Sequence, residues 1–150
     1  PVLWLSRQAI YKEGTAIRGG IPLCWPWFGP HPTDPAKPAH GFVRTKPWAV
    51  GSASAGADGQ TELRLILPED AQTLALWPHP FVLELEVTVG PALRVALVAT
   101  NSGREPFTCG GALHSYCLRS TSRNECFVKR GGVSNADSPR AVSGKVMCQK

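Results

Sequence analysis

The sequence predicts an all-β protein built as an antiparallel β-sandwich, and three observations lead to that fold class. Apolar and polar residues alternate with period two in several short runs, as they do in strands that bury one face. No segment sustains the apolar stripe of period 3.6 that is typical of a helix. Turn-forming residues separate the runs, and the 150 residues include 15 Gly and 14 Pro.

Three strands are expected in order along the middle of the chain. The first covers residues 61–67. The second covers 83–89, where Leu and Val at the odd positions alternate with Glu and Thr at the even ones. The third covers 93–100, where Leu, Val, Leu and Ala at the odd positions alternate with Arg, Ala, Val and Thr at the even ones. Because Gly90-Pro91 forms a turn between the second and third strands, these two should pair as an antiparallel hairpin.

A fourth strand is expected after the chain reverses at Asn101-Ser102-Gly103. It would run from residue 107 to residue 116. One of its faces would carry Thr108, Gly110, Ala112, His114 and Tyr116.

The character of the chain changes after Tyr116. Residues 1–116 hold nine Lys and Arg against nine Asp and Glu, whereas 117–150 hold seven against two, so the whole net charge of +5 lies in the last segment. This segment has only isolated apolar residues, which cannot offset the entropy cost of ordering it. We therefore expect a domain at 1–116 and a poorly ordered basic tail at 117–150. A basic arm that binds nucleic acid is the alternative, although no recognition motif supports it.

Composition excludes several classes of protein. The apolar runs are far shorter than the roughly 20 residues of a membrane helix, and the first residues do not resemble an export signal. Five cysteines without a C-x-x-C pair favour free thiols over a disulfide scaffold or a zinc site. No nucleotide-binding glycine loop and no G-x-S-x-G elbow is present. We expect a cytoplasmic protein with no metal, no cofactor, no membrane contact and no nucleic acid partner.

Two motifs near the start of the chain point to a phosphorylated ligand. They read IRGGIPLCWPWFG over 17–29 and HGFVR over 40–44. Paired glycines let a backbone approach a ligand closely. Arg18 and Arg44 could clamp a phosphate, because the planar guanidinium fork matches phosphate oxygens.

Aromatic residues around these motifs could stack on the C–H face of a sugar ring. The candidates are Trp25, Trp27, Phe28 and Trp48. Packing in the core is the commoner role for any one of them.

His114 is the candidate for proton transfer. It lies near the end of the fourth expected strand, after Gly110-Gly111, and an imidazole exchanges protons near neutral pH. A structural histidine on a strand is the commoner case. The prediction is geometric: the guanidinium groups of Arg18 and Arg44 and the imidazole of His114 should converge on one phosphorylated ring.

The two motifs, followed by ALHSY at 112–116, resemble the hexose-6-phosphate mutarotases, or glucose-6-phosphate 1-epimerases, of the aldose 1-epimerase superfamily. The resemblance extends nearly continuously over 1–116. It implies a galactose-mutarotase-like supersandwich, which is an all-β fold of two large antiparallel sheets. It also implies interconversion of the α and β anomers of a hexose 6-phosphate without a cofactor.

The resemblance assigns roles to four residues. His114 matches the histidine that protonates the ring oxygen while a carboxylate takes the anomeric hydroxyl proton. Arg18 and Arg44 match substrate-binding arginines, and His40 matches a second histidine that lines the pocket. Ala39 stands where family members often have a polar residue.

A second departure from the family lies after Tyr116. Family members continue there with many more strands, which carry a binding aspartate and the catalytic glutamate. Neither Glu125 nor Asp137 stands in a matching context. We therefore expect an incomplete member that lacks the catalytic carboxylate. A non-catalytic sugar-phosphate-binding β-sandwich is the alternative, and the oligomeric state stays open.

Overall fold

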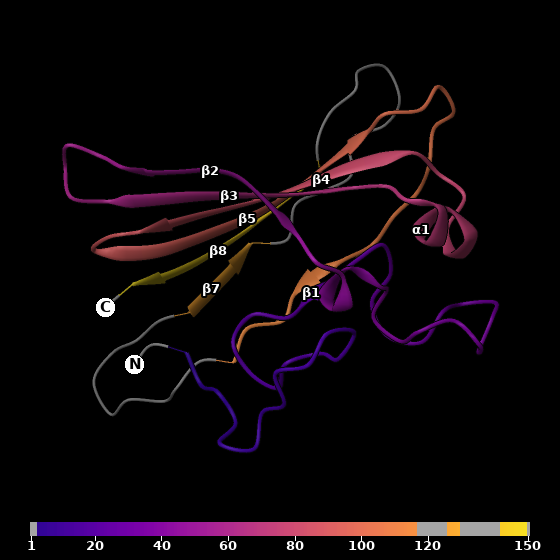
Figure 1. The fold of residues 1–150 in the computed structure, drawn as a ribbon, viewed down its shortest axis with the longest axis horizontal. Helices are drawn as coiled ribbons and strands as arrows, with labels where there is room; N and C mark the ends of the chain where they lie inside the picture. Colours follow the sequence, from indigo (N-terminus) through magenta and orange to yellow (C-terminus); the bar gives the residue numbers. More distant parts are fainter. Residues whose placement is uncertain (1–2, 117–125, 130–141, 150) are drawn as a thin grey trace. The chain divides into compact units, whose positions relative to one another are not determined.

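The computed structural model describes residues 3–116, 126–129 and 142–149, and the contacts within the chain divide it into two compact units. Unit 1 comprises Pro1–Pro47 and Thr108–Arg123. Unit 2 comprises Trp48–Phe107 and Asn124–Lys150. Figure 1 follows the chain through both units.

Unit 2 is built on a six-stranded antiparallel sheet with the order β2-β3-β4-β5-β8-β7. Its strands are β2 (Ala49–Ala55), β3 (Thr61–Pro68), β4 (Phe81–Val89), β5 (Ala92–Asn101), β7 (Cys126–Lys129) and β8 (Val142–Gln149). The first three predicted strands are confirmed as β3, β4 and β5. The predicted hairpin is confirmed as well, since β4 and β5 pair without a break from Phe81↔Asn101 to Val89↔Leu93.

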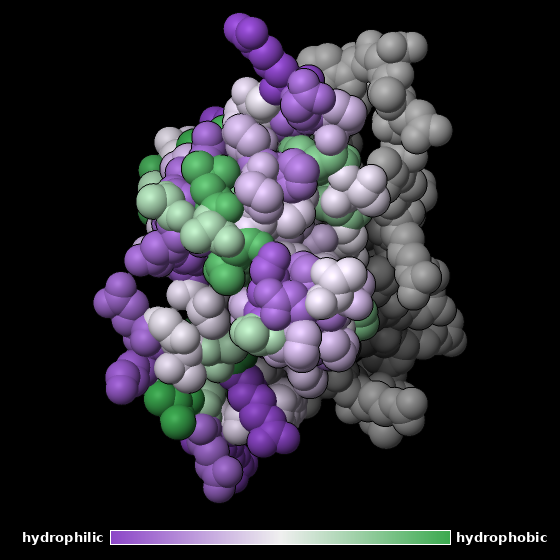
Figure 2. All heavy atoms as spheres, turned by 90° about the vertical axis from the view of Figure 1, so that its right-hand side faces the viewer, coloured by the Kyte–Doolittle hydropathy of each residue, from purple (hydrophilic) through white to green (hydrophobic). Residues whose placement is uncertain are grey.

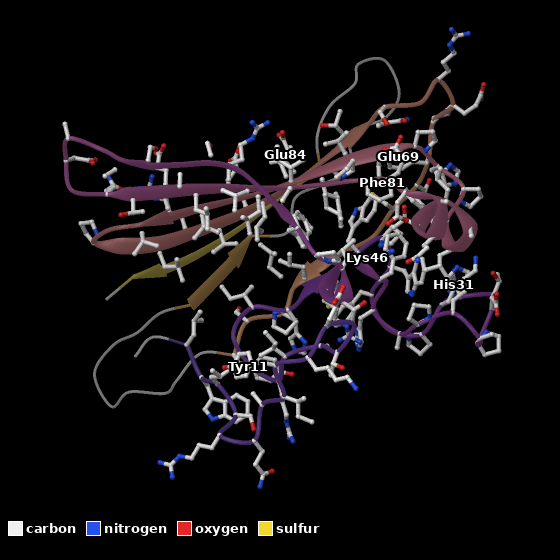
Figure 3. The ribbon with its side chains drawn as sticks, in the orientation of Figure 1. Tyr11, His31, Lys46, Glu69, Phe81 and Glu84 are labelled. Atoms are coloured by element: carbon white, nitrogen blue, oxygen red, sulfur yellow. The ribbon has the colours of Figure 1, made fainter. Side chains whose placement is uncertain are left out.

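The alternation of residues separates the two faces of this sheet. Phe81 and Leu83 of β4 are fully buried, whereas Glu84 forms an ion pair with Arg64 of β3. Phe81 and Glu84, both labelled in Figure 3, point to opposite faces of β4. The buried side chains of this sheet come from β3, β4 and β5. They are Leu67, Phe81, Leu83, Val95, Leu97 and Ala99.

A short helix that the sequence analysis did not predict, α1 (Ala71–Leu76), joins β3 to β4. The amide of Thr73 donates to the Asp70 carboxylate at 2.6 Å, and the Asp70 amide donates to the Thr73 hydroxyl at 2.8 Å. This capping box begins the helix. Six residues make fewer than two turns, so a 3.6-residue apolar period has no room to show. β2 was also missed, because its sequence AVGSASA does not alternate and its residues are all exposed.

Unit 1 is held by backbone hydrogen bonds rather than by long strands. Its regular elements are β1 (Leu23–Cys24), β6 (Ala112–Leu113) and the 3-10 helix η1 (Val43–Thr45). β1 pairs with β6, and the same antiparallel register continues on both sides. The amides of Gly110, His114 and Tyr116 donate to the carbonyls of Pro26, Pro22 and Gly20, respectively. The predicted fourth strand therefore exists as a ladder over 110–116, although only two of its residues are regular strand.

A third segment of unit 1 closes onto this ladder. The Trp4 amide donates to the Tyr116 carbonyl at 2.8 Å, and the Gly20 amide donates to the Trp4 carbonyl at 2.8 Å. Ser6 donates to the carbonyl of Arg18 at 3.0 Å. The start of the chain is thereby fixed beside both strands of the ladder.

The antiparallel β class predicted from the sequence is confirmed. The predicted boundary at 116 stays a prediction. Of the expected poorly ordered tail, residues 117–125, 130–141 and 150 lie outside the described residues, and the two described segments are the strands β7 and β8. Among the described residues, no helix has the length and apolar character needed to span a bilayer.

The surface mixes hydrophilic residues with separate hydrophobic patches, as the face in Figure 2 shows. Among the residues whose burial the structure describes, most of the exposed large hydrophobic side chains belong to unit 1. These are Leu5, Ile10, Tyr11, Ile17, Phe28 and Tyr116.

Candidate functional site

Two glycines of the sequence motifs allow backbone segments of unit 1 to touch. Gly41 has φ = 71° and lies against the carbonyl of Trp25, where an added Cβ would overlap the carbonyl oxygen and carbon. Gly19 has φ = 120°, and a Cβ there would lie 2.6 Å from the carbonyl oxygen of Trp4. Both positions demand glycine because of the left-handed φ and because of the missing space. The motifs therefore build the frame of the site as well as lining it.

His114 extends from the ladder between 20–26 and 110–116. Its amide donates to the Pro22 carbonyl at 3.0 Å, which fixes the backbone, while its side chain is exposed. Its ring centroid lies 5.0 Å from that of Tyr116. The prediction that His114 and Tyr116 share a face is thus confirmed.

Phe28 connects His114 with His40. The ring of Phe28 lies 4.9 Å from the His40 ring and 6.0 Å from the His114 ring, measured between centroids. Phe28 is 54% exposed although its ring contacts both imidazoles. The structure therefore brings both predicted histidines to one exposed aromatic face.

Arg44 is anchored next to His40. It lies in η1, is half-buried, and donates from Nη2 to the Ala39 carbonyl oxygen at 3.0 Å. Its charge also reaches the thiol of Cys24, which pairs with Ala112 in the ladder. Burial raises the pKa of Cys24, and Arg44 opposes that shift without reversing it. Three of the predicted site residues thus lie close together in one unit.

Arg18 differs from Arg44 in how its side chain is held. Its carbonyl accepts from Ser6, but its side chain is exposed, and no hydrogen bond or ion pair to another described residue holds its guanidinium. It lies two residues from Gly20, whose carbonyl accepts the amide of Tyr116. The backbone of Arg18 is therefore close to the ladder, while the predicted convergence of both guanidinium groups with His114 stays a prediction.

Some of the candidate aromatic residues are packed in the interior, whereas others are exposed. Trp25 and Trp27 are buried at 2% and 8% exposure, and each meets Phe42 edge-on. Trp27 also donates to the Pro38 carbonyl at 2.9 Å and contacts His31, which Figure 3 labels. Trp48 falls in unit 2. Of the four candidates, Phe28 is the one with an exposed ring within unit 1.

The ring series continues to two residues that the sequence analysis did not assign to the site. Tyr116 contacts His114, and Trp4 lies 5.7 Å from Tyr116 between ring centroids. Tyr116 could have been found from its spacing, because it stands two residues after His114 on the same strand face. Trp4 could not, since no local pattern predicts its pairing with a residue more than a hundred positions away.

The charge around the site favours an anion. Among the described residues of unit 1, the carboxylates are Glu13 and Asp34, against six Lys and Arg: Arg7, Lys12, Arg18, Lys37, Arg44 and Lys46. The Asp34 carboxylate accepts from the amide of Ala36. Within the described part of the chain, no three His, Cys, Asp or Glu side chains gather as metal ligands would. The candidate site therefore provides imidazole and guanidinium groups beside an aromatic ring.

Several known proteins are similar to this chain in sequence and fold. A relative from Escherichia coli (strain K12), named "Putative glucose-6-phosphate 1-epimerase", is 42% identical over 77% of this chain and 37% of its own length. A relative of the same name from Haemophilus influenzae is 28% identical over 98% of this chain and 52% of its own. A crystal structure from Salmonella typhimurium, described as "a putative mutarotase (YeaD)", superimposes with a TM-score of 0.70 at 39% identity, over 77% of this chain and 37% of that one.

The chain thus spans between about a third and about half of the length of these relatives. The model of the aldose 1-epimerase family matches residues 1–130 and so extends beyond Tyr116. The family model, the sequence identity and the fold agree over most of the chain. This chain belongs to the aldose 1-epimerase family, a family of isomerases.

Proposed function

We propose that this chain binds a hexose 6-phosphate in unit 1 and takes part in the interconversion of its α and β anomers. The observation that carries the proposal is that the rings of His40 and His114 both contact the exposed Phe28, with Arg44 bonded to the residue beside His40. The name of the Escherichia coli relative supports this choice of substrate.

In the proposed reaction, His114 is the acid. A base takes the proton of the anomeric hydroxyl, the O–H electrons form the C1 carbonyl, and the bond between C1 and the ring oxygen breaks. His114 then donates its proton to the ring oxygen. Rotation about the C1–C2 bond followed by the reverse steps gives the other anomer. The exposed side chain of His114 leaves its ring open to a ligand.

The remaining residues would bind and orient the sugar phosphate. Arg44, fixed by its bond to Ala39, offers the nitrogens that are not engaged there to the phosphate, and the exposed Arg18 supplies a second guanidinium. Phe28 presents an apolar face on which the C–H side of a pyranose can stack. His40 lines the same face.

The base is the open part of the proposal. Glu13 and Asp34 are the two carboxylates among the described residues of unit 1, and no hydrogen bond or ion pair joins either of them to His114. We propose that the chain has low turnover for this reason, since one of two proton-transfer partners contributes on the order of a hundredfold or more. The same observation favours the second candidate function, which is binding of a sugar phosphate without conversion.

The test measures anomer exchange of glucose 6-phosphate by NMR, together with binding by calorimetry, for the wild type and His114→Ala. His79→Ala, in unit 2, is the matched histidine control. Exchange that is faster than the uncatalysed rate, and lost only in His114→Ala, supports the enzyme. Binding without faster exchange supports the binding module. A wild type that does not bind the sugar phosphate contradicts both.

The cytoplasmic location, and the exclusion of nucleic acid and membrane partners, stay predictions. Binding of a nucleic acid that weakens with salt and is lost on deletion of 117–150 would contradict the exclusion of a nucleic acid partner.

A further inference from the structure

Two hydrogen bonds join Gly29 and His40. The amide of His40 donates to the carbonyl oxygen of Gly29 at 2.7 Å, and the amide of Gly29 donates back to the Nδ1 atom of His40 at 3.1 Å. Both residues have left-handed backbones, with φ of 84° and 67°. Histidine is one of the few residues besides glycine that adopts this conformation readily. We call this pair the latch.

The latch determines which ring nitrogen of His40 carries the proton. A nitrogen that accepts a hydrogen bond needs a free lone pair, so Nδ1 is unprotonated. The ring is then neutral, and its proton is on Nε2. An imidazolium has protons on both nitrogens and could not accept from Gly29.

The latch also sets what the Nε2–H group can meet. The His40 ring lies against Phe28, the residue next to Gly29 in sequence, so the same contacts that hold the tautomer hold the ring beside the exposed aromatic face. No described residue accepts a hydrogen bond from Nε2 of His40. The group is therefore a donor without a described protein acceptor, next to the proposed sugar.

His114 lacks such a constraint. No hydrogen bond from another described residue reaches its ring, although its amide is bonded to Pro22. No hydrogen bond of the frame therefore assigns a tautomer to the His114 ring. The two histidines beside Phe28 are held in chemically different ways.

We infer that the latch keeps His40 as a neutral Nε2–H donor to an acceptor oxygen of the bound sugar, so that His40 orients the ligand and only His114 exchanges protons. This inference rests on the proposed function for its ligand. The state of the ring itself does not depend on any ligand.

The first measurement is long-range ¹H–¹⁵N NMR of the full chain labelled in histidine, without sugar, because the two tautomers give different cross-peak patterns. His40 should show the Nε2–H pattern. His31 is an internal control, because its Nδ1 accepts from the amide of Asp34 at 3.1 Å and should give the same pattern. An Nδ1–H or imidazolium pattern for His40 at neutral pH overturns the inference.

The second measurement uses two substitutions at position 40. His40→Asn keeps an acceptor near the Nδ1 position and tolerates the left-handed backbone, but it has no donor at the Nε2 position. It should retain wild-type stability while its affinity for glucose 6-phosphate falls about three- to tenfold. His40→Gln reaches the Nε2 position but offers Gly29 no acceptor at Nδ1. It should regain part of the affinity and lose stability.

The outcomes separate the two proposals. Unchanged affinity in His40→Asn overturns the donor role of His40, even where the wild type binds. A wild type that does not bind glucose 6-phosphate overturns the proposed function and the donor role together. The tautomer pattern then still tests the latch by itself.

Discussion

The two compact units of this chain hold their backbones by different means. Unit 2 relies on long antiparallel strands whose apolar faces meet at a core around Phe81 and Leu83. Unit 1 has strands of only two residues and relies on single backbone hydrogen bonds, close glycine contacts and a series of aromatic rings. The candidate site lies entirely in unit 1, where exposed backbone and side chains are available to a ligand.

This difference predicts how each unit responds to substitution. In unit 1, a substitution that adds a single atom at a close backbone contact should disturb the whole unit, because no long strand holds the neighbouring segments in register. In unit 2, the cost should follow the buried volume that is removed, as in an ordinary core.

The largest effect is expected for Gly41→Ala. The added Cβ would overlap the carbonyl of Trp25, and the left-handed φ of 71° adds strain. We expect a loss of more than about 4 kcal/mol in the free energy of unfolding. Gly59→Ala in unit 2 is the control, since φ is 78° there but the Cβ would meet open space. It should cost only about 1–2 kcal/mol by denaturant unfolding. Equal losses would contradict the contrast between the units.

Leu83→Ala should have the next largest effect. The side chain is fully buried in unit 2, so its removal should cost about 2–5 kcal/mol, measured as a shift in the denaturation midpoint. Val50→Ala on the exposed β2 should change stability by less than about 0.5 kcal/mol. Anomer exchange should persist in Leu83→Ala wherever unit 1 stays folded. Loss of exchange in a folded Leu83→Ala protein would show that the site depends on unit 2.

Arg18→Leu should separate binding from stability. Its guanidinium makes no bond to another described residue, so the free energy of unfolding should change by less than about 0.5 kcal/mol. Affinity for glucose 6-phosphate should fall about tenfold or more, because hydrogen bonds to charged groups contribute about 1.5–3 kcal/mol. Affinity for unphosphorylated glucose should stay the same, which calorimetry can measure. An equal loss of affinity for both sugars would show that Arg18 does not bind the phosphate.

The two thiols among the described residues of unit 1, those of Cys24 and Cys109, should give the smallest effect. Burial raises the pKa of Cys24 and of Cys109, while Arg44 opposes the shift at Cys24 and Trp25 opposes it at Cys109. A raised pKa in the folded state stabilises the protein below the thiol pKa of the unfolded chain, and this contribution is lost as the pH rises through the folded pKa. Both thiols should therefore react more slowly with iodoacetamide at pH 8 than in the unfolded chain, as peptide mapping by mass spectrometry can show. Reaction at the unfolded rate would mean that unit 1 opens readily.

The same contrast explains what could be predicted from the sequence. β3, β4 and β5 were found because the sheet buries one of their faces, which leaves a period of two in the residues. β2 left no such trace because both of its faces are exposed, and α1 is too short to show a helical period. These misses follow from burial and length rather than from the motifs.

Only those site residues that belong to a sequence motif could be predicted. His40, Arg44 and His114 were named from short strings, and the structure places all three in one unit. The role of Trp4 could not be predicted, because its amide and carbonyl bond to Tyr116 and Gly20, which are not its neighbours in the sequence. Gly29 was missed because its carbonyl accepts from the amide of His40, eleven residues later. Such bonds use atoms that every residue has, so they leave no compositional signal.

The most direct test of a sugar-phosphate site in unit 1 is NMR titration of the full chain, labelled in its four histidines and five phenylalanines, with glucose 6-phosphate. The account predicts saturable shifts for His40, His114 and Phe28, with no shift for His79 or Phe81 of unit 2 and much weaker effects of glucose. Shifts confined to unit 2 residues, or equal responses to glucose and glucose 6-phosphate, would contradict it.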